Sequence, residues 1–313
     1  MDNVCHSLMG AVMGRAGLAR RTPLGMSALV IANNLPDVDV AVFATDTLAM
    51  SFRRGWTHGV LAQATLPIAF TALVVAYDRL MRARRAGSTD AERVKASELL
   101  LLSYAGVLAH VFMDFLNSYG VRLLMPFSER WFYGDALYIV DPFMYIVLGA
   151  GWWWSSRRHR ARRPDAARPA RIALAVATAY MLVMLGSNAW ARSVVRSGLV
   201  RAGRPADTRF MVTPVFANPF AREVVLDVGD RYEKGHLWFE PLPHFRPAGF
   251  GIEKGTHAPE MQPLLQVPRA RAFLRWSRFP FVQAGPGSPP PVWINDYRYA
   301  NAGPYGWSSV KLQ

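Results

Sequence analysis

Apolar runs long enough to cross a bilayer recur through the first 190 residues, and they constrain the fold of this 313-residue chain more than any other feature. A helix needs about 20 mostly apolar residues to span the hydrocarbon core of a membrane. We predict six candidate spans, of which the first is short and can instead be a buried or re-entrant helix. They cover residues 4–19, 24–44, 59–80, 98–118, 135–154 and 171–190. The expected fold is therefore an α-helical membrane bundle of about five or six spans.

The remainder of the chain has a different character, because Pro, Gly and aromatic residues are mixed with polar ones. The segments RFMVTPVF and REVVLDVGDRY alternate apolar and polar residues, as half-buried strands do. The segment RFPFVQAGPGSPPPVWINDYRY predicts two short strands joined by a Gly- and Pro-rich loop. We therefore predict a transmembrane helical domain over residues 1–190 and a small, mostly β domain over residues 191–313.

The net charge of +14 could indicate a nucleic-acid partner, but the distribution of the basic residues argues against one. The tracts 15–21, 79–95 and 155–171 together hold 16 Lys and Arg residues, whereas the links 45–58 and 119–134 hold four. Membrane proteins keep such an excess on the cytoplasmic side. This bias predicts a multi-pass protein without a nucleic-acid partner, whose N-terminus and C-terminal domain both lie outside the cytoplasm.

Seven His and Asp residues lie within or beside the apolar spans, all near the ends that the charge bias places outside. An ionisable group at such a depth costs several kcal/mol unless it is paired, hydrated or bound to an ion. His110 and Asp114 are four residues apart, so a helix presents both on one face. Pro36 interrupts its helix, and extended residues after it would turn Asp37 and Asp39 to the same side. The full set is His6, Asp37, Asp39, His58, His110, Asp114 and Asp141.

Each member of this set also has a simpler interpretation. His6 can be a capped residue at a helix end, Asp141 before Pro142 can begin a helix, and a His/Asp pair can be a structural hydrogen bond. The common depth of all seven favours a shared metal site. Imidazole together with carboxylate suits zinc first, and manganese or iron as alternatives. The set exceeds what one catalytic zinc needs, so it allows two metals, or carboxylates that orient His ligands.

Five motifs in order resemble those of the membrane-bound metal-dependent hydrolase family of bacterial inner membranes, some members of which are LexA-regulated. They are MDNVCHSLMGAVMGRAGL, NNLPDVD, RRGWTHGVLA, LAHVFMDFLNSYGVRLLMPFSERWFYGD and IVDPF. The resemblance covers residues 1–150 closely, and the segments RFPFV and DYRYA are similar to the C-terminal part of longer members. It implies a location in the bacterial inner (cytoplasmic) membrane and a metal-dependent hydrolase activity.

The resemblance also implies which residues act. The motif residues fall on His6, Asp37, Asp39, His58, His110 and Asp114 as metal ligands, with Asp141 following. Some relatives carry His where this chain has Arg53, which leaves the site one possible ligand poorer or means that this His is not a ligand. Asp39 or Asp141, if not a ligand, would serve as the general base or would orient a His.

The function expected from these features is hydrolysis of an ester by water that the metal activates, with a phosphoester as the preferred candidate. A site at bilayer depth suggests a membrane lipid or a lipid-linked substrate. Arg53, Arg54 and Arg122 lie at the same level and could clamp its anionic group, or they could be surface charges facing lipid headgroups. Two alternatives stay open, namely an ion- or proton-coupled transporter and a non-catalytic assembly protein in which the cluster only ties helices together.

Overall fold

The computed structural model describes residues 1–45, 49–84, 93–285, 287–288, 290–302 and 306–312, and it divides the chain into two compact units. The first comprises Met1–Ala41 and Arg53–Leu185, and the second comprises Val42–Phe52 and Gly186–Gln313. The predicted domain boundary after residue 190 lies inside one continuous helix, α7 (Arg168–Arg201). Residues 85–92 of the predicted basic tract 79–95 lie outside the described residues.

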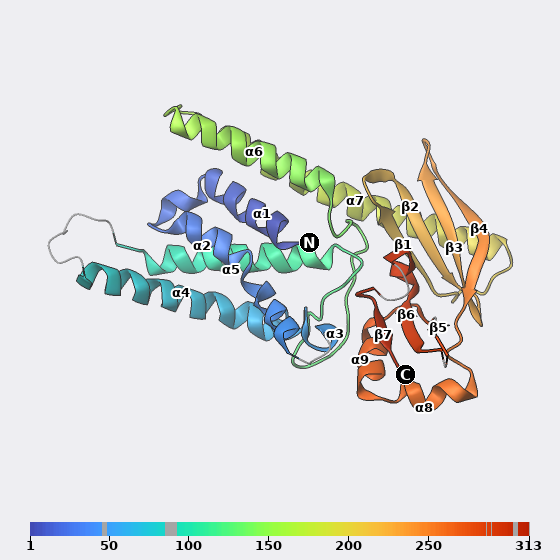
Figure 1. Ribbon diagram of the computed structural model, residues 1–313. Helices are drawn as coiled ribbons and strands as arrows, with labels where there is room; N and C mark the ends of the chain where they lie inside the picture. The colour runs from blue at the N-terminus through green and yellow to red at the C-terminus, as the bar shows by residue number, and fades with distance from the viewer. Residues whose placement is uncertain (46–48, 85–92, 286, 289, 303–305, 313) are drawn as a thin grey trace. The chain divides into compact units, whose positions relative to one another are not determined.

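The first unit is helical, and its helices pack in neighbouring pairs (Figure 1). The pairs in contact are α1 with α2, α2 with α5, α4 with α5, and α1 with α6. The elements are α1 (Asn3–Arg15), η1 (Leu18–Arg21), α2 (Gly25–Ala32), η2 (Leu35–Ala44), α4 (Val60–Arg84), α5 (Ala96–Phe115), α6 (Pro142–Arg160) and the first part of α7. Because α5 contacts both α2 and α4, residues from distant parts of the sequence meet beside it.

Three helices among the described residues, α4, α5 and α7, are long and apolar enough to cross a membrane. A fourth span results if the bent pair α2 and η2, with 51° between its halves, is counted as one. The predicted segment 4–19 corresponds to α1, which has 13 residues. The predicted segment 135–154 overlaps α6, whose last turn is basic. Neither reaches the length and apolarity of a span.

The break between α2 and η2 occurs at two asparagines, whose side chains bond backbone carbonyl groups in the last turn of α2. The Asn33 side chain donates to the Leu29 carbonyl over 2.9 Å, and the Asn34 side chain donates to the Val30 carbonyl over 2.8 Å. This satisfies polar backbone groups that apolar surroundings could not. The extended backbone after Pro36, on which a shared side for Asp37 and Asp39 depended, is not formed, because residues 35–44 form a 3₁₀ helix.

Close contact between α2 and α5 depends on Gly106. A Cβ atom at this position would lie 2.6 Å from the Cβ of Ala32 and 3.1 Å from the backbone nitrogen of Asn33. We expect Gly106→Ala to lower the free energy of unfolding by about 1–3 kcal/mol, because the added methyl group forces the two helices apart. Thermal unfolding of the purified protein in detergent measures this change.

Gly149 provides a matched control within a helix of the same unit. A Cβ atom there would meet no other atom within 4 Å, so Gly149→Ala should be neutral or should stabilise α6 by up to about 1 kcal/mol. Equal effects of the two substitutions would show that the approach of α2 to α5 does not limit packing.

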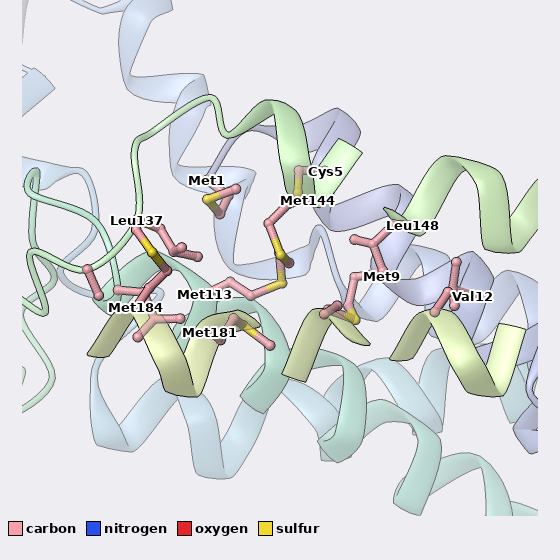
Figure 2. Close-up of a cluster of buried hydrophobic side chains, with 14 of the residues drawn as sticks. Met1, Cys5, Met9, Val12, Met113, Leu137, Met144, Leu148, Met181 and Met184 are labelled. Carbon is pink, nitrogen blue, oxygen red and sulfur yellow. The ribbon is translucent and has the colours of Figure 1, made fainter. Parts of the chain in front are cut away.

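Sulfur-containing side chains dominate the largest buried core of the first unit (Figure 2). Met is flexible and fills irregular gaps between helices of unequal length. The core joins α1, α5, α6 and α7, and it includes Met1, Cys5, Met9, Met113, Met144, Met181 and Met184. Because His6 follows Cys5 and Asp114 follows Met113, polar side chains of the first unit directly border this apolar core.

The second unit contains two antiparallel sheets, which confirms the predicted β-rich C-terminal region. The four-stranded sheet has the order β1-β2-β3-β4, from β1 (Phe210–Val215), β2 (Asn218–Asp227), β3 (Arg231–Phe239) and β4 (Pro243–Glu253). The three-stranded sheet consists of β5 (Pro280–Ala284), β6 (Val292–Asp296) and β7 (Ser309–Lys311). The short helices are α3 (Ala49–Phe52), η3 (Pro259–Met261), α8 (Gln262–Leu265), α9 (Pro268–Trp276) and η4 (Tyr297–Ala302).

Both faces of the four-stranded sheet are covered, because successive side chains along each strand point to opposite faces. Val212 and Val224 pack with Val195 of α7, whereas Met211 and Val225 pack with aromatic residues of the smaller sheet region. This follows from the two-residue repeat of a strand. The predicted pair of strands around the Gly- and Pro-rich loop is β5 and β6, which pair antiparallel.

Candidate metal centre

Two His and two Asp side chains converge in the first unit. Each offers one atom to the group, and these four atoms all lie within 4.8 Å of one another. The residues are Asp37, His58, His110 and Asp114, and each is at most 3% exposed. Protein groups that are ionisable and buried together are paired or bind an ion.

Three separate stretches of chain supply the four side chains. His110 and Asp114 lie on one face of α5, as their spacing of four residues predicts. His58 lies in the turn that precedes α4, and Asp37 lies in the first turn of η2. The sequence predicted only that these residues lie at a common depth, and the structure brings these four together at one place.

The hydrogen bonds of the two imidazoles leave a lone pair on each Nε2 of the neutral rings. His110 Nδ1 lies 2.7 Å from the Asn33 carbonyl oxygen, which only accepts, so this nitrogen donates its proton there. Thr57 Oγ1 donates to Asp39 over 3.0 Å and therefore accepts from Nδ1 of His58, also at 3.0 Å. The two Nε2 atoms lie 3.1 Å apart, so either one of them carries a proton or a metal cation lies between their lone pairs.

The two carboxylates add one unsatisfied oxygen each. Asp37 Oδ1 and Asp114 Oδ2 are buried and have no hydrogen-bond partner among the residues that the structure describes. Asp114 Oδ2 lies 3.3 Å from His58 Nε2 and 3.6 Å from His110 Nε2, and Asp37 Oδ1 lies 3.9 Å and 3.8 Å from the same two atoms. Ligands about 2.0–2.1 Å from a tetrahedral zinc are separated by about 3.3 Å. The group could therefore hold a divalent metal ion.

The other carboxylate oxygen of Asp114, Oδ1, contacts groups outside the set of four candidate ligands. Oδ1 accepts from Arg54 Nη2 over 3.0 Å, contacts the main-chain amine of Met1, and lies 3.3 Å from His6 Nε2. His6 also stacks on His110, with ring centroids 3.8 Å apart. His6, one of the predicted ligands, is thus brought to the cluster, but it lies against the opposite oxygen of Asp114.

Asp39 lies behind His58, on the side away from the other donors. Its Oδ2 accepts from the backbone N–H of Arg54 over 2.7 Å and lies 3.5 Å from His58 Nδ1. A 3₁₀ helix turns about 120° per residue, so residues two apart do not share a side as they would in a strand. This is why Asp37 contributes an oxygen to the group, whereas Asp39 accepts from Thr57, which in turn accepts from His58 Nδ1.

We expect Asp39→Asn to weaken metal binding by about 10–100-fold, because Thr57, which accepts from the Nδ1–H of His58, loses the carboxylate that holds its hydroxyl. Competition with a chelator, using the full chain in detergent, measures this affinity. Asp141→Asn is the matched control and should leave the affinity unchanged. Equal losses in both variants would show that Asp39 has no particular role in holding His58.

Asp141 lies in the same unit but serves a different purpose. Its Oδ1 accepts from the backbone N–H groups of Phe143 and Met144 over 3.0 and 3.1 Å, so it caps the N-terminus of α6. Its Oδ2 accepts from the hydroxyl of Tyr180 over 3.0 Å. The structure thus gives Asp141 the helix-starting role that the sequence left open, and it is not one of the four donors.

The three arginines predicted to contact an anionic group differ in exposure. Arg54 and Arg122 are 5% and 4% exposed, so the alternative of surface charges facing lipid headgroups is wrong for both. Arg53 has a side chain that is 22% exposed, and its guanidinium lies 3.6 Å from Asp37 and 3.4 Å from Asp39. Among the three, Arg53 combines proximity to a candidate ligand with access to solvent or lipid.

Three further groups that support the site were not predicted from the sequence. The Asn33 carbonyl fixes the ring of His110, Thr57 fixes the ring of His58, and Asn117 accepts from Arg54 Nη1 over 3.0 Å. Thr57 adjoins His58, and Asn117 follows Asp114 by three residues at the end of α5, so proximity along the chain was the available signal. The role of a backbone carbonyl has no signature in a sequence.

Comparison with known proteins places this architecture in a family. YfhP of Bacillus subtilis (strain 168), described as uncharacterized, is 24% identical over 157 residues, which cover 47% of this chain and 43% of YfhP. The aligned region is thus less than half the length of that relative. No solved structure matches the chain. The family described as YdjM inner membrane protein matches residues 1–191. This stretch includes α4, α5, the part of α7 up to Ala191, and all four donors. The chain therefore belongs to the YdjM inner membrane protein family.

Proposed function

We propose that this protein is a membrane-embedded metal-dependent hydrolase that cleaves an ester. The ester that the site favours is a phosphoester of a lipid or lipid-linked substrate. The observation that supports the proposal most directly is the pair of imidazole Nε2 atoms 3.1 Å apart, flanked by two buried carboxylate oxygens. A hydrogen-bonded structural cluster would place donors opposite acceptors. With both imidazoles neutral, four acceptor atoms converge here, which is the arrangement of a cation site.

His58, His110, Asp37 and Asp114 would hold the metal, and two imidazoles with two carboxylates favour zinc, with manganese or iron as alternatives. The chemistry that a divalent metal supplies at such a site is Lewis acidity toward water and toward the oxygens of an ester. The chain itself fixes the orientation of both imidazoles, through Thr57, which Asp39 holds, and through the Asn33 carbonyl. Such fixed orientation spares reorganisation during a reaction.

The charge balance near the group supports an anionic substrate. Arg54 is committed to Asp114 and Asn117, so its charge offsets that of a candidate ligand. Arg53 lies near both Asp37 and Asp39, yet keeps part of its side chain accessible. A guanidinium can bind two oxygens of a phosphate at once. We propose that Arg53 contacts the phosphate group of the substrate.

The decisive experiment combines metal analysis with a hydrolysis assay on the purified full chain in detergent. The substrates are phosphatidic acid, an isoprenyl monophosphate and, for comparison, a carboxylic ester, diacylglycerol. We expect release of inorganic phosphate from at least one phosphoester, its loss after chelation and its return when zinc or manganese is added. A preparation that contains metal but hydrolyses none of these substrates would contradict the phosphoesterase proposal and favour a non-catalytic role for the cluster.

A further inference from the structure

Two adjoining cavities lie near the basic C-terminal end of α6, one at the turn that follows this helix and one between α6 and α7. The first has a volume of about 530 Å³ and is lined chiefly by Trp153, Trp154, Arg157, Arg158, Arg163 and Asp165. The second has a volume of about 450 Å³ and is lined mainly by Val147, Ala150, Gly151, Ile172, Ala173 and Val176. The two share Trp154, Arg158 and Asp165 in their linings, so one leads into the other.

The first cavity is basic and aromatic. The guanidinium of Arg157 lies 5.0 Å from the ring centroid of Trp153, and that of Arg158 lies 5.4 Å from the ring centroid of Trp154. Asp165 is the acidic residue of the lining, and it forms an ion pair with Arg158. The three arginines of the lining therefore leave an excess of positive charge, which suits an anion with several oxygens.

The second cavity is mostly apolar, with Arg158, Asp165 and Arg168 as its charged lining residues. Its shape follows from a close approach of two helices. A Cβ atom at Gly151 would collide with that of Ala173, so α6 and α7 touch at this point. Beyond the contact, Ile172 and Val176 are 53% and 45% exposed on α7. The α7 helix is itself long and apolar enough to cross a membrane, so these side chains lie on a candidate span.

We propose that the paired cavities bind one anionic diacyl phospholipid, with the phosphate near Arg157 and Arg163 and an acyl chain along the groove beside Ile172. The charge of the first cavity selects the headgroup, and the apolar second cavity requires acyl chains, which a free phosphate ion lacks. Basic pockets between membrane helices recognise anionic headgroups in this way, and Trp side chains favour the same interfacial depth. The proposal does not depend on the proposed hydrolase activity, because none of the four candidate metal ligands lines either cavity.

Native mass spectrometry of the purified full chain tests this proposal, with dioleoyl phosphatidylglycerol and dioleoyl phosphatidylcholine as probes. These lipids have the same acyl chains and differ in headgroup charge. We expect wild type to retain one phosphatidylglycerol, with an affinity on the order of tenfold above that for phosphatidylcholine. In the double variant Arg157→Gln, Arg163→Gln this preference should disappear. Equal retention of the two lipids by wild type would overturn the proposal.

The control variant is Arg160→Gln, Arg162→Gln, which removes the same charge from the same tract but from residues that do not line the cavities. It should keep the preference for phosphatidylglycerol. A second test is Ala150→Phe, which leaves the charge unchanged and fills the apolar cavity, and it should lower retention of both lipids. Equal losses in the two arginine variants, or full retention in both Arg157→Gln, Arg163→Gln and Ala150→Phe, would show that the cavities are not the lipid site.

Discussion

His110→Ala should leave the purified protein with almost no bound metal. Its Nε2 lies 3.1 Å from that of His58 and within 4 Å of both ligand carboxylates, so the substitution removes a central donor of the group. The loss in affinity should exceed the roughly 10–100-fold expected for a residue that only orients a ligand. Elemental analysis by mass spectrometry, after gel filtration in detergent has shown a monodisperse protein, measures the metal content per chain.

Two other histidines make this measurement specific. His159→Ala changes an exposed imidazole in the basic tract and should leave the metal content as in wild type. His6→Ala removes a buried ring that stacks on His110 but contacts the opposite oxygen of Asp114, so it should keep most of the metal. If His110→Ala retained the metal of wild type, the four residues would not be the binding site, and the hydrolase proposal would fall with it.

Asp296→Ala should lower the free energy of unfolding of the second unit by about 3–5 kcal/mol, the usual effect of breaking a buried ion pair. Asp296 is fully buried and accepts from Arg298 Nε over 2.9 Å, from Ser277 Oγ over 2.5 Å and from the backbone N–H of Arg278 over 2.9 Å. Without it, the guanidinium of Arg298, 4.6 Å from the ring centroid of Trp276, stays buried without its carboxylate. Denaturation followed by tryptophan fluorescence measures the change. Asp207→Ala, at an exposed carboxylate, should shift it by at most about 0.5 kcal/mol.

The same carboxylate predicts how acid affects the second unit. Burial by itself would raise the pKa of Asp296, but the charge and hydrogen bonds of Arg298 outweigh it and hold this pKa below the ordinary value. A depressed native pKa contributes stability that is fully present above the unfolded value, about 3.9, and is lost as pH falls through the lower native value. Wild type should therefore lose stability more steeply than Asp296→Asn below about pH 4. Parallel curves for the two proteins would contradict this prediction.

Some of the fold and site followed directly from the sequence. A spacing of four residues on a helix brings His110 and Asp114 to one face whatever the surroundings are. Alternation of apolar and polar residues in 209–216 and 222–232 predicted the strands β1 and β2, because one face of each strand needs an apolar partner. The long apolar runs of α4, α5 and α7 were also sufficient to predict these helices as candidate spans, since hydropathy and length are the main requirements for a span.

Other features depend on backbone geometry that apolar content does not reveal. The segment 135–154 reads as one apolar run, but the backbone N–H groups of Ala136 and Leu137 bond to the Leu116 carbonyl, so the helix begins only at Pro142. Arg54 has a φ of +51°, which directs its own N–H to Asp39 while its guanidinium reaches Asp114. Nothing in two adjacent arginines indicates which one turns inward.

The order in which the four donors occur along the chain has a consequence for biogenesis. Asp37 and His58 leave the ribosome well before His110 and Asp114, and the α4–α5 hairpin must close before the last two can join the first two. If the four residues hold the proposed metal, a nascent chain that ends before residue 110 offers an ion only part of its coordination sphere, and loading would follow insertion of α5. Until then the early carboxylates would need water or a proton in place of the cation.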